Sequence, residues 1–346
     1  MTKPSRTLTI ACVTISLALV AACSSHHAKK VAASSAIPTP TPTPTTSSAA
    51  PKPKVIAVNP FTGGTPSRNG VVAVKIDDTA NGRPQVNIDR ANIVYVEQVE
   101  GGLTRLVAVY NTSLPTVEAV RSVRANDPEL LAQYGPIAFA ASGGAPNPLF
   151  VLDHSSLKTS INDRGGPGFA RDGSRGAPYN LTANLAQVGS ALHAPRGKDI
   201  GLVWSAAAAK AAVKKPLGMS VRTYVGATPV QFDWNPGLKK YVRLIGGVPQ
   251  HAADGAYVST PNVIVQFCDV TPYPQDVDVM GNVAKFTHSI GKGRAVVFRN
   301  GHRIEGRWTR SSANNGTHFT SLAGNPISLS PGGAWVLLVA TGAPLG

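Results

Sequence analysis

A proline- and threonine-rich tract near the start of the chain limits which residues can fold. Residues 24 to 54 contain no acidic and no aromatic residue, and residues 38 to 45 alternate proline with threonine. Such a composition cannot bury enough apolar surface to offset the entropy lost on folding, and it favours an extended polyproline II conformation. We therefore expect a disordered stalk in this tract and a folded part that begins near residue 55.

The segment before the stalk has the features of an export signal. Lys3 and Arg6 precede an apolar run of fifteen residues, 8 to 22, which is shorter than the roughly 18 to 20 residues that span a bilayer. The run ends in Leu-Val-Ala-Ala followed by Cys23, which resembles the lipobox of bacterial lipoproteins. The resemblance implies that residues 1 to 22 are removed as a signal peptide. It also implies that Cys23 is acylated and anchors the protein at the extracytoplasmic face of the cell membrane.

The positive charge of the chain is partly explained by this leader and stalk. The net charge is +15, and the first 54 residues hold six of the basic residues and no acidic one, so the folded part carries +9. That part has no long basic run and no alternation of basic with aromatic residues, which nucleic-acid-binding surfaces usually show. We therefore expect a membrane-anchored protein without a nucleic-acid partner.

The folded part is expected to be α+β, with two regions that differ in character. Residues 55 to 195 predict a mixed α/β domain, with strands at 71–76, 93–99, 103–110 and 137–141 and helices at 127–134 and 180–192. Residues 196 to 346 predict a mostly β domain after a short helical stretch at 206–213, with buried strands at 263–267 and 334–340. The clearest local signal is Asn300-Gly301 between two alternating strands, which is typical of a type I′ hairpin.

Several short stretches of the folded part are similar to one known family. They include Gly82-Arg83-Pro84, the segments 99–105, 120–124 and 171–181, and Pro331-Gly332-Gly333-Ala334-Trp335. These stretches resemble the YerB-type lipoproteins, the DUF3048 family, over nearly the whole folded part. The resemblance implies a bacterial envelope lipoprotein in two parts and carries no established reaction. It also leads us to expect histidines near Ala141 and at Tyr179, which this chain lacks.

Arginine is the preferred base in the first region of the folded part. Residues 83 to 175 contain eight arginines and only one lysine. A planar guanidinium can bind phosphate or carboxylate through two parallel hydrogen bonds, whereas surface solubility would accept either base. The candidate ligand-binding residues lie in turns or at strand ends beside small residues: Arg105, Arg121, Arg124, Arg171 and Arg175. They predict an arginine-rich cleft for an anionic envelope polymer or an acidic loop of an envelope protein.

Two other interpretations of the same residues stay open. The arginines could pair inside the fold with acids such as Glu97, Glu100, Asp127 and Asp172. Alternatively, Glu100 and Asp172 could act as acid and base of a metal-independent hydrolase that cleaves glycosidic or phosphodiester bonds, which requires two carboxylates a few ångströms apart. We prefer a binding or accessory module because no complete catalytic set is evident in the sequence.

Searches for catalytic and cofactor motifs support that preference. The chain has no zinc-protease motif, no paired-cysteine motif, no phosphate-binding glycine loop and no nucleophile elbow, so we expect neither a metal nor a cofactor. Ser155 and Lys158 match the spacing of penicillin-recognising serine enzymes, but no Lys-Thr-Gly strand follows. Cys268 lies in an apolar run and is predicted to be a small buried hydrophobe.

Overall fold

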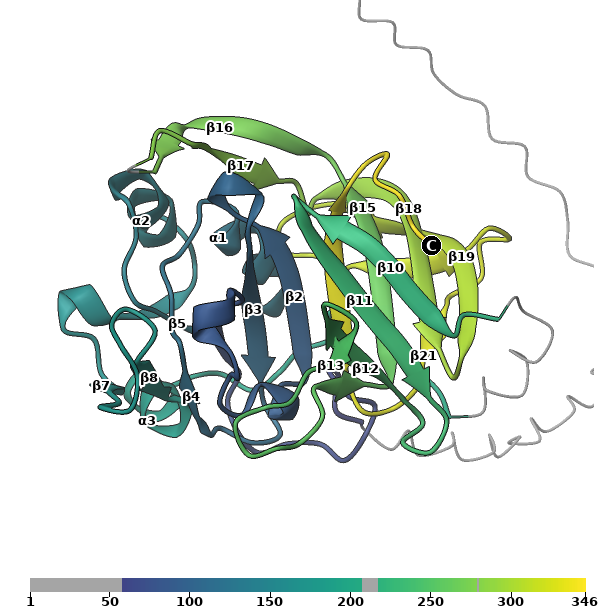
Figure 1. Cartoon of the computed structure of the whole chain (residues 1–346), viewed down its shortest axis with the longest axis horizontal. Helices are drawn as coiled ribbons and strands as arrows, with labels where there is room; N and C mark the ends of the chain where they lie inside the picture. The colour runs from purple at the N-terminus through teal and green to yellow at the C-terminus, as the bar shows by residue number, and fades with distance from the viewer. Residues whose placement is uncertain (1–57, 207–216, 279) are drawn as a thin grey trace, which may run out of the picture. The chain divides into compact units, whose positions relative to one another are not determined.

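A ten-stranded sheet runs through the folded part of the chain (Figure 1). The computed structural model describes residues 58–206, 217–278 and 280–346, and these residues belong to one compact unit. Across the sheet the strands are β20 (His318–Ser321), β19 (His302–Arg310), β18 (Gly291–Arg299), β15 (Asn262–Cys268), β22 (Ala334–Ala340), β2 (Ile93–Gln98), β3 (Thr104–Tyr110), β1 (Val72–Asp77), β5 (Ala138–Ala141) and β6 (Lys158–Ile161). The signal peptide, Cys23 and the stalk lie outside the described residues, as does nearly all of the helical stretch expected at 206–213.

The last strand of the chain lies in the middle of this sheet. Strand β22 is parallel to β2 on one side and to β15 on the other. It therefore joins strands from the first sequence region to strands from the second. The change of pattern near residue 195 marks a change in local architecture, while the hydrogen-bonded sheet continues across both regions.

The central strands are apolar because both faces of the sheet are covered. Every residue of β1, β15 and β22 is buried except the last residue of β22, which fits strands that contact layers on both sides. One face packs against a five-stranded sheet made of β10 (Ser220–Val225), β11 (Thr228–Asn235), β12 (Lys240–Ile245), β13 (Val248–Pro249) and β14 (Ser259–Thr260). The opposite face packs against residues of the helical segment 127–134. The charged exceptions in β1 are Lys75 and Asp77, which become important below.

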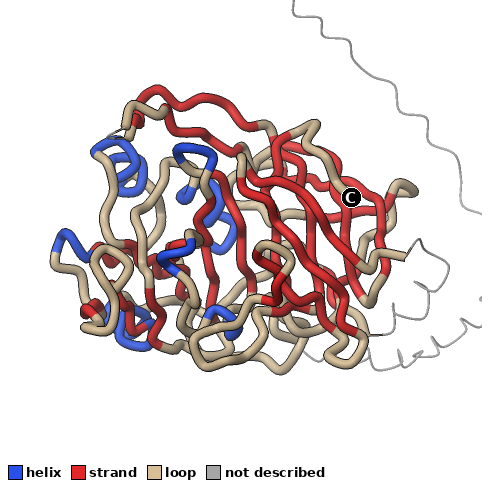
Figure 2. Tube along the Cα trace, viewed as in Figure 1, coloured by secondary structure: helices blue, strands red, loops and turns tan. Residues whose placement is uncertain are grey.

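The helices are short and belong to the first region. Figure 2 shows them on one side of the molecule, and every helix in the described residues lies between residues 80 and 191. The α-helices are α1 (Asp127–Leu131), α2 (Pro146–Asp153) and α3 (Leu185–Ala191), and the 3₁₀ turns are η1 (Ala80–Gly82), η2 (Ile88–Arg90), η3 (Glu100–Gly102), η4 (Ala132–Tyr134) and η5 (Asn162–Arg164). The expected α+β class with a strand-rich second region is confirmed.

Most of the expected elements are present, with two errors among the helices. The helix expected at 127–134 is confirmed as α1 continued by η4. The helix expected at 180–192 is wrong at its start, because 181–184 form strand β8 and Asn184 caps α3 by accepting a hydrogen bond from the Gln187 N–H. Helix α2 was not expected, since its two prolines hide the helical pattern although proline is tolerated in a first turn.

Smaller pairings complete the fold. The three-stranded sheet contains β4 (Thr116–Glu118), β8 (Leu181–Asn184) and β7 (Phe169–Arg171), β9 (Val203–Trp204) pairs with β21 (Ser328–Leu329), and β16 (Val270–Val277) pairs with β17 (Val283–Thr287). The hairpin predicted around Asn300-Gly301 is confirmed as β18 and β19, and both turn residues have positive φ, as a type I′ turn requires.

Candidate anion-binding site

Three neighbouring strands place charged side chains in one row of the ten-stranded sheet. Asp77 on β1 lies opposite Arg105 on β3, and Arg105 lies opposite Glu97 on β2. Lys75 precedes Asp77 by two residues, so its side chain lies on the same face. Because β1 also runs parallel to β5, this row lies near the carboxyl ends of parallel strands, where ligands of α/β sheets commonly bind.

Lys75 is the buried anchor of this row. Its ammonium is fully buried and forms ion pairs with Glu97 and, at 2.7 Å, with Asp127. Asn126 donates a further hydrogen bond to Glu97 at 2.8 Å. Burial lowers the pKa of Lys75 to about 8, while the charge and hydrogen bond of Asp127 oppose that effect. These residues fix the segment before α1 against the sheet.

Two arginines of that segment pair with acids. The Arg121 N–H bonds the Lys75 carbonyl, which holds the segment beside the end of β1. The Nε of Arg121 lies 3.0 Å from a carboxylate oxygen of Asp77. Arg124 forms an ion pair with Glu100 in the turn between β2 and β3. Both guanidiniums remain partly exposed, so their pairing does not close the site to solvent.

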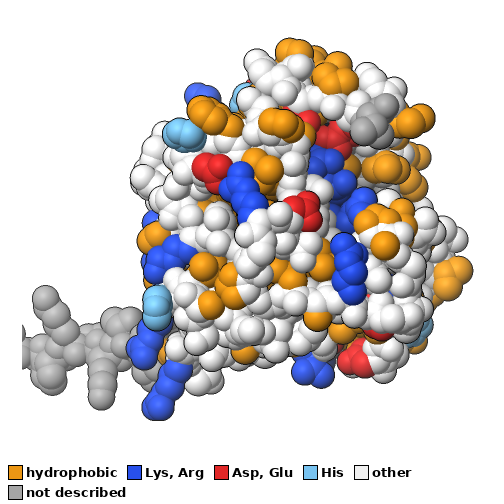
Figure 3. All heavy atoms as spheres, turned by 90° about the vertical axis from the view of Figure 1, so that its left-hand side faces the viewer, with side chains coloured by type: hydrophobic (Ala, Val, Ile, Leu, Met, Phe, Trp, Pro, Cys, Tyr) orange, Lys and Arg blue, Asp and Glu red, His pale blue; other side chains and the backbone are white. Residues whose placement is uncertain are grey.

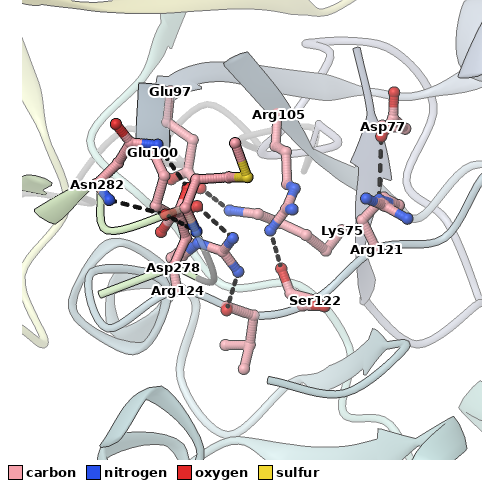
Figure 4. A network of polar contacts seen from close by, with 12 residues as sticks. Lys75, Asp77, Glu97, Glu100, Arg105, Arg121, Ser122, Arg124, Asp278 and Asn282 are labelled. Carbon is pink, nitrogen blue, oxygen red and sulfur yellow. Dashed lines mark hydrogen bonds and ion pairs between the residues drawn. The ribbon is translucent and has the colours of Figure 1, made fainter. Parts of the chain in front are cut away.

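Arg105 lies between these two pairs and has no acidic partner of its own (Figure 4). Its Nη1 donates to the Ser122 carbonyl at 3.2 Å, and no carboxylate oxygen of the described residues lies within 4.0 Å of its nitrogens. Burial, together with the charges of Arg124 and Arg121, lowers the pKa of Arg105 to about 9. We call Arg105, Arg121 and Arg124 the arginine cluster. The cluster retains one guanidinium, that of Arg105, which no acid of the described residues neutralises by direct contact.

A hairpin of the second region lies near the cluster. Strand β17 packs against η3, and β16 packs against α2, where Tyr273 donates a hydrogen bond to Asn147 at 2.7 Å. Burial raises the pKa of Asp276 on β16, and the charge of Arg124 acts in the opposite direction. The hairpin therefore places the carboxyl group of Asp276 near the cluster, and this group forms no ion pair within the described residues.

The other two predicted arginines lie elsewhere. Arg171 is exposed on β7, donates to the Asn180 side chain at 2.8 Å, and is not brought into the cluster. Arg175 lies 3.4 Å from Glu118 and donates to the carbonyls of Gly82 and Pro84 at 3.3 and 2.5 Å. It borders a recess of about 430 Å³.

Tyr179 connects this recess with the arginine cluster. Its ring lines the recess, and the guanidinium carbon of Arg121 lies 5.3 Å from the ring centroid. Such a cation–aromatic contact orients both groups. Ala141, the other position where a histidine was expected, ends β5 one residue before Ser142, whose N–H bonds the Arg121 carbonyl. Both positions at which the family resemblance predicts a histidine therefore lie next to Arg121.

The two acids considered for catalysis are not brought together by a shared partner. Burial acts to raise the pKa of Glu100, but the hydrogen bond and charge of Arg124 outweigh it and lower that pKa. Asp172 lies in a turn, where hydrogen bonds from Ser174 lower its pKa. Both carboxyl groups are thus favoured in the ionised state, and neither is set apart as a proton donor.

The alternative in which the arginines pair with acids inside the fold holds for only part of the site. Glu100 pairs with an arginine, but Glu97 and Asp127 pair with Lys75, and Asp172 forms no ion pair in the described residues. Lys75, Asp77 and Glu118 also belong to the site, although they were not expected there. A lysine inside an otherwise apolar strand, followed by two acids, was the available signal.

Other candidates from the sequence have structural partners. Ser155 donates to the Leu152 carbonyl and Lys158 to the His193 carbonyl, both at 2.7 Å, and neither side chain bonds the other. Cys268 is buried, as predicted, and burial raises the pKa of its thiol to about 12. Within residues 58–206, 217–278 and 280–346, no group of three or more histidine, cysteine, aspartate or glutamate side chains is placed to hold a metal ion.

The surface around the site is mixed in charge. Figure 3 views the molecule from the side of α2, β7 and β8, and basic side chains lie beside acidic ones on it without forming a continuous basic surface. Such a surface suits recognition of a limited anionic group better than a long uniform polyanion such as nucleic acid. In the described part of the chain, no helix is long and apolar enough to cross a membrane.

The architecture and both sequence regions define the class of protein. The N-terminal domain of DUF3048, a protein family of unknown function, matches residues 61–197, and the DUF3048 C-terminal domain matches residues 219–336. The chain therefore belongs to the DUF3048 family. Among solved structures it is similar to the YerB protein from Bacillus subtilis, with a TM-score of 0.70 and 20% identity over 84% of this chain and 100% of that one. No curated protein matches the chain significantly.

Proposed function

We propose that this protein is an extracytoplasmic lipoprotein whose folded part binds an anionic component of the cell envelope at the arginine cluster. Acylated Cys23 would hold it at the membrane, and the stalk would separate the folded part from the lipid surface. The partner would be a phosphorylated or carboxylated envelope polymer, or an acidic loop of an envelope protein. The proposal is one of binding and not of turnover.

The observation that carries the proposal is the unpaired guanidinium of Arg105. A charge withdrawn from water is costly unless an opposite charge or several hydrogen bonds compensate for it. The nearest arginines are already engaged with Asp77 and Glu100, so their acids are not free to serve Arg105 as well. An anion that reaches Arg105 would supply the missing charge and accept two parallel hydrogen bonds.

The acids beside the cluster support binding over hydrolysis. General-acid catalysis needs a carboxyl group that is protonated near the working pH. Arg124 lowers the pKa of Glu100, against the opposite effect of burial, and therefore favours its ionised form. Glu100 thus holds a cationic side chain in place.

The binding experiment uses the full-length mature protein in detergent micelles. Isothermal titration with a soluble poly(glycerol phosphate) should show binding, and Arg105→Ala should weaken it at least about tenfold, the effect of losing charge-assisted hydrogen bonds. Arg105→Lys keeps the charge but loses the planar guanidinium. Its affinity should lie between those of the unaltered protein and Arg105→Ala. Arg307→Ala is the matched control, because Arg307 is an exposed arginine on β19.

Two results would overturn the proposal. Equal affinity of the Arg105→Ala, Arg307→Ala and unaltered proteins would show that only general charge attracts the polymer. Release of polymer fragments by the unaltered protein, abolished by Glu100→Gln, would show a hydrolase instead.

The anchor has a separate test. Cells fed an alkyne-bearing palmitate analogue should label the unaltered protein in the membrane fraction. Cys23→Ala should remove the label and release the protein from membranes, because a single uncleaved apolar run of fifteen residues is too short for a stable span. Undiminished labelling of Cys23→Ala would contradict lipidation at this residue.

A further inference from the structure

Two surface recesses meet at Arg83 and Pro84. Both residues line both recesses, which have volumes of about 430 and 370 Å³. The first recess is formed by residues of the DUF3048 N-terminal region, and the second lies between that region and the β12–β13 turn of the C-terminal region. Boundaries between structural regions are common places for ligand sites. We call the two recesses together the Arg83 groove.

The first recess has two arginines and an amide side chain beside its apolar lining. Its walls include Asn81, Arg175 and the ring of Tyr179, and none of its lining residues is acidic. The Nε of Arg83 donates to the Thr79 carbonyl at 3.1 Å, whereas its two terminal nitrogens have no hydrogen-bond partner among the described residues. The recess therefore offers an open guanidinium fork, an amide side chain and an aromatic ring.

Hydrogen bonds from Arg175 fix the wall of this recess. By bonding the carbonyls of Gly82 and Pro84, Arg175 fixes the main chain on both sides of Arg83. Burial lowers the pKa of Arg83, while the charge of nearby Asp78 opposes that effect. Asp78 is already engaged by both terminal nitrogens of Arg243, at 2.8 and 2.7 Å. The Nε of Arg83 is thus held in position, while its terminal nitrogens form no ion pair within the described residues.

The second recess is mainly apolar. Its lining includes Ile245, Val248 and Pro249, with Gln250 and His251 as polar members besides Arg83, and again no acid. The side chain of Val248 is 66% exposed, which leaves apolar surface uncovered beside the cationic recess. A short aliphatic group bound there would remove that surface from water.

We infer that the Arg83 groove binds a glycopeptide of the muropeptide class, with its sugar in the first recess, its peptide carboxylate on Arg83 and its aliphatic peptide side chains in the second recess. Each part of the groove selects one part of this ligand. An aromatic ring with an amide suits a sugar, and an open fork between the recesses suits a carboxylate. The groove adjoins the arginine cluster through Tyr179 but includes none of its three arginines. The choice of an envelope glycopeptide rests on the extracytoplasmic location in the proposed function, whereas the groove and the cluster are tested by different variants.

The test titrates the full-length mature protein in detergent with three small probes. They are muramyl dipeptide, an N-acetylglucosamine oligomer that lacks carboxylate and peptide, and the free dipeptide that lacks sugar. We expect muramyl dipeptide to bind at least about tenfold more tightly than either partial probe, because only it can fill both recesses. Equal affinities for all three, or no binding of muramyl dipeptide, would overturn the inference.

Variants in each recess locate the binding. Arg83→Gln keeps a donor of similar size and should weaken muramyl dipeptide binding at least about tenfold, as should Val248→Asp, which places an acid in the apolar recess. Arg307→Ala should bind like the unaltered protein. Thermal unfolding of each variant shows whether it is folded, and unchanged affinity in folded Arg83→Gln would assign the binding to another surface. Displacement of muramyl dipeptide by poly(glycerol phosphate), dependent on Arg83, would assign the groove to phosphate polymers and overturn the glycopeptide.

Discussion

The two regions of the protein use buried and partly buried arginines differently. In the second region Arg243, Arg299 and Arg310 are each about 1% exposed, whereas the arginine cluster of the first region is partly open to solvent. Each buried arginine donates two or more hydrogen bonds to protein oxygens, as Arg243 does to Asp78. Arg105 donates a single hydrogen bond, to a carbonyl. The presence of arginine therefore does not indicate a site, but a partly exposed guanidinium with a single hydrogen bond does.

Removal of a buried arginine should have the largest effect on stability. Arg243→Ala leaves Asp78 buried without its counter-charge, which typically costs about 3–5 kcal/mol of unfolding free energy. Urea denaturation measures this loss. The matched control is Arg222→Ala, which breaks an exposed pair with Asp233 and should cost less than about 1 kcal/mol. Similar losses for both variants would remove the contrast between buried and exposed arginines.

A buried arginine without a direct acidic partner should rank next. Arg310 donates to the carbonyls of Glu129 at 2.6 Å and Ala313 at 2.5 Å and to the Ser289 hydroxyl at 2.9 Å. Arg310→Met keeps the apolar volume but leaves these acceptors unpaired, and we expect a loss of about 2–3 kcal/mol. The same denaturation experiment would contradict a structural role if the unfolding free energy fell by less than about 0.5 kcal/mol.

Arg105 should matter little for stability. Arg105→Ala loses one hydrogen bond but also removes a cation that lies near Arg121 and Arg124, so the two effects offset each other. We expect a change below about 1 kcal/mol in either direction. A loss as large as that of Arg243→Ala would show that Arg105 is structural, and the comparison between the two regions would then fail.

The smallest expected effect is a pH dependence at Glu100. Arg124 outweighs burial and lowers the pKa of Glu100 below its ordinary value of 4.5, so the folded state binds this proton less readily than the unfolded state. The resulting stabilisation is present above pH 4.5 and is lost as the pH falls through the folded-state pKa. Urea midpoints of the unaltered protein should therefore decline more steeply below pH 4.5 than those of Glu100→Gln. Parallel declines would show that the ion pair contributes nothing.

Local sequence patterns predicted the elements better than the site. Alternation and turn residues were sufficient for the hairpins of β2–β3 and β18–β19, since their partners are close in sequence. The arginine cluster was predicted in part, because three of the five candidate arginines converge. The pairing of Lys75 with Asp127 was not predicted, since contacts across 52 residues depend on tertiary packing. The hydrogen bonds from Arg175 to the carbonyls on either side of Arg83 were not predicted for the same reason, since they join residues 91 and 93 positions apart.

The position of β22 has a consequence for how the chain completes its fold. Synthesis delivers residues 334–340 after both β2 and β15, yet both of these strands need them as a hydrogen-bonding neighbour. Until then each of those strands presents a row of unsatisfied main-chain groups, the type of edge through which polypeptides aggregate. A premature stop before Ala334 would leave two open edges in the middle of the molecule, so even a small truncation at the tail should be far more harmful than its length suggests.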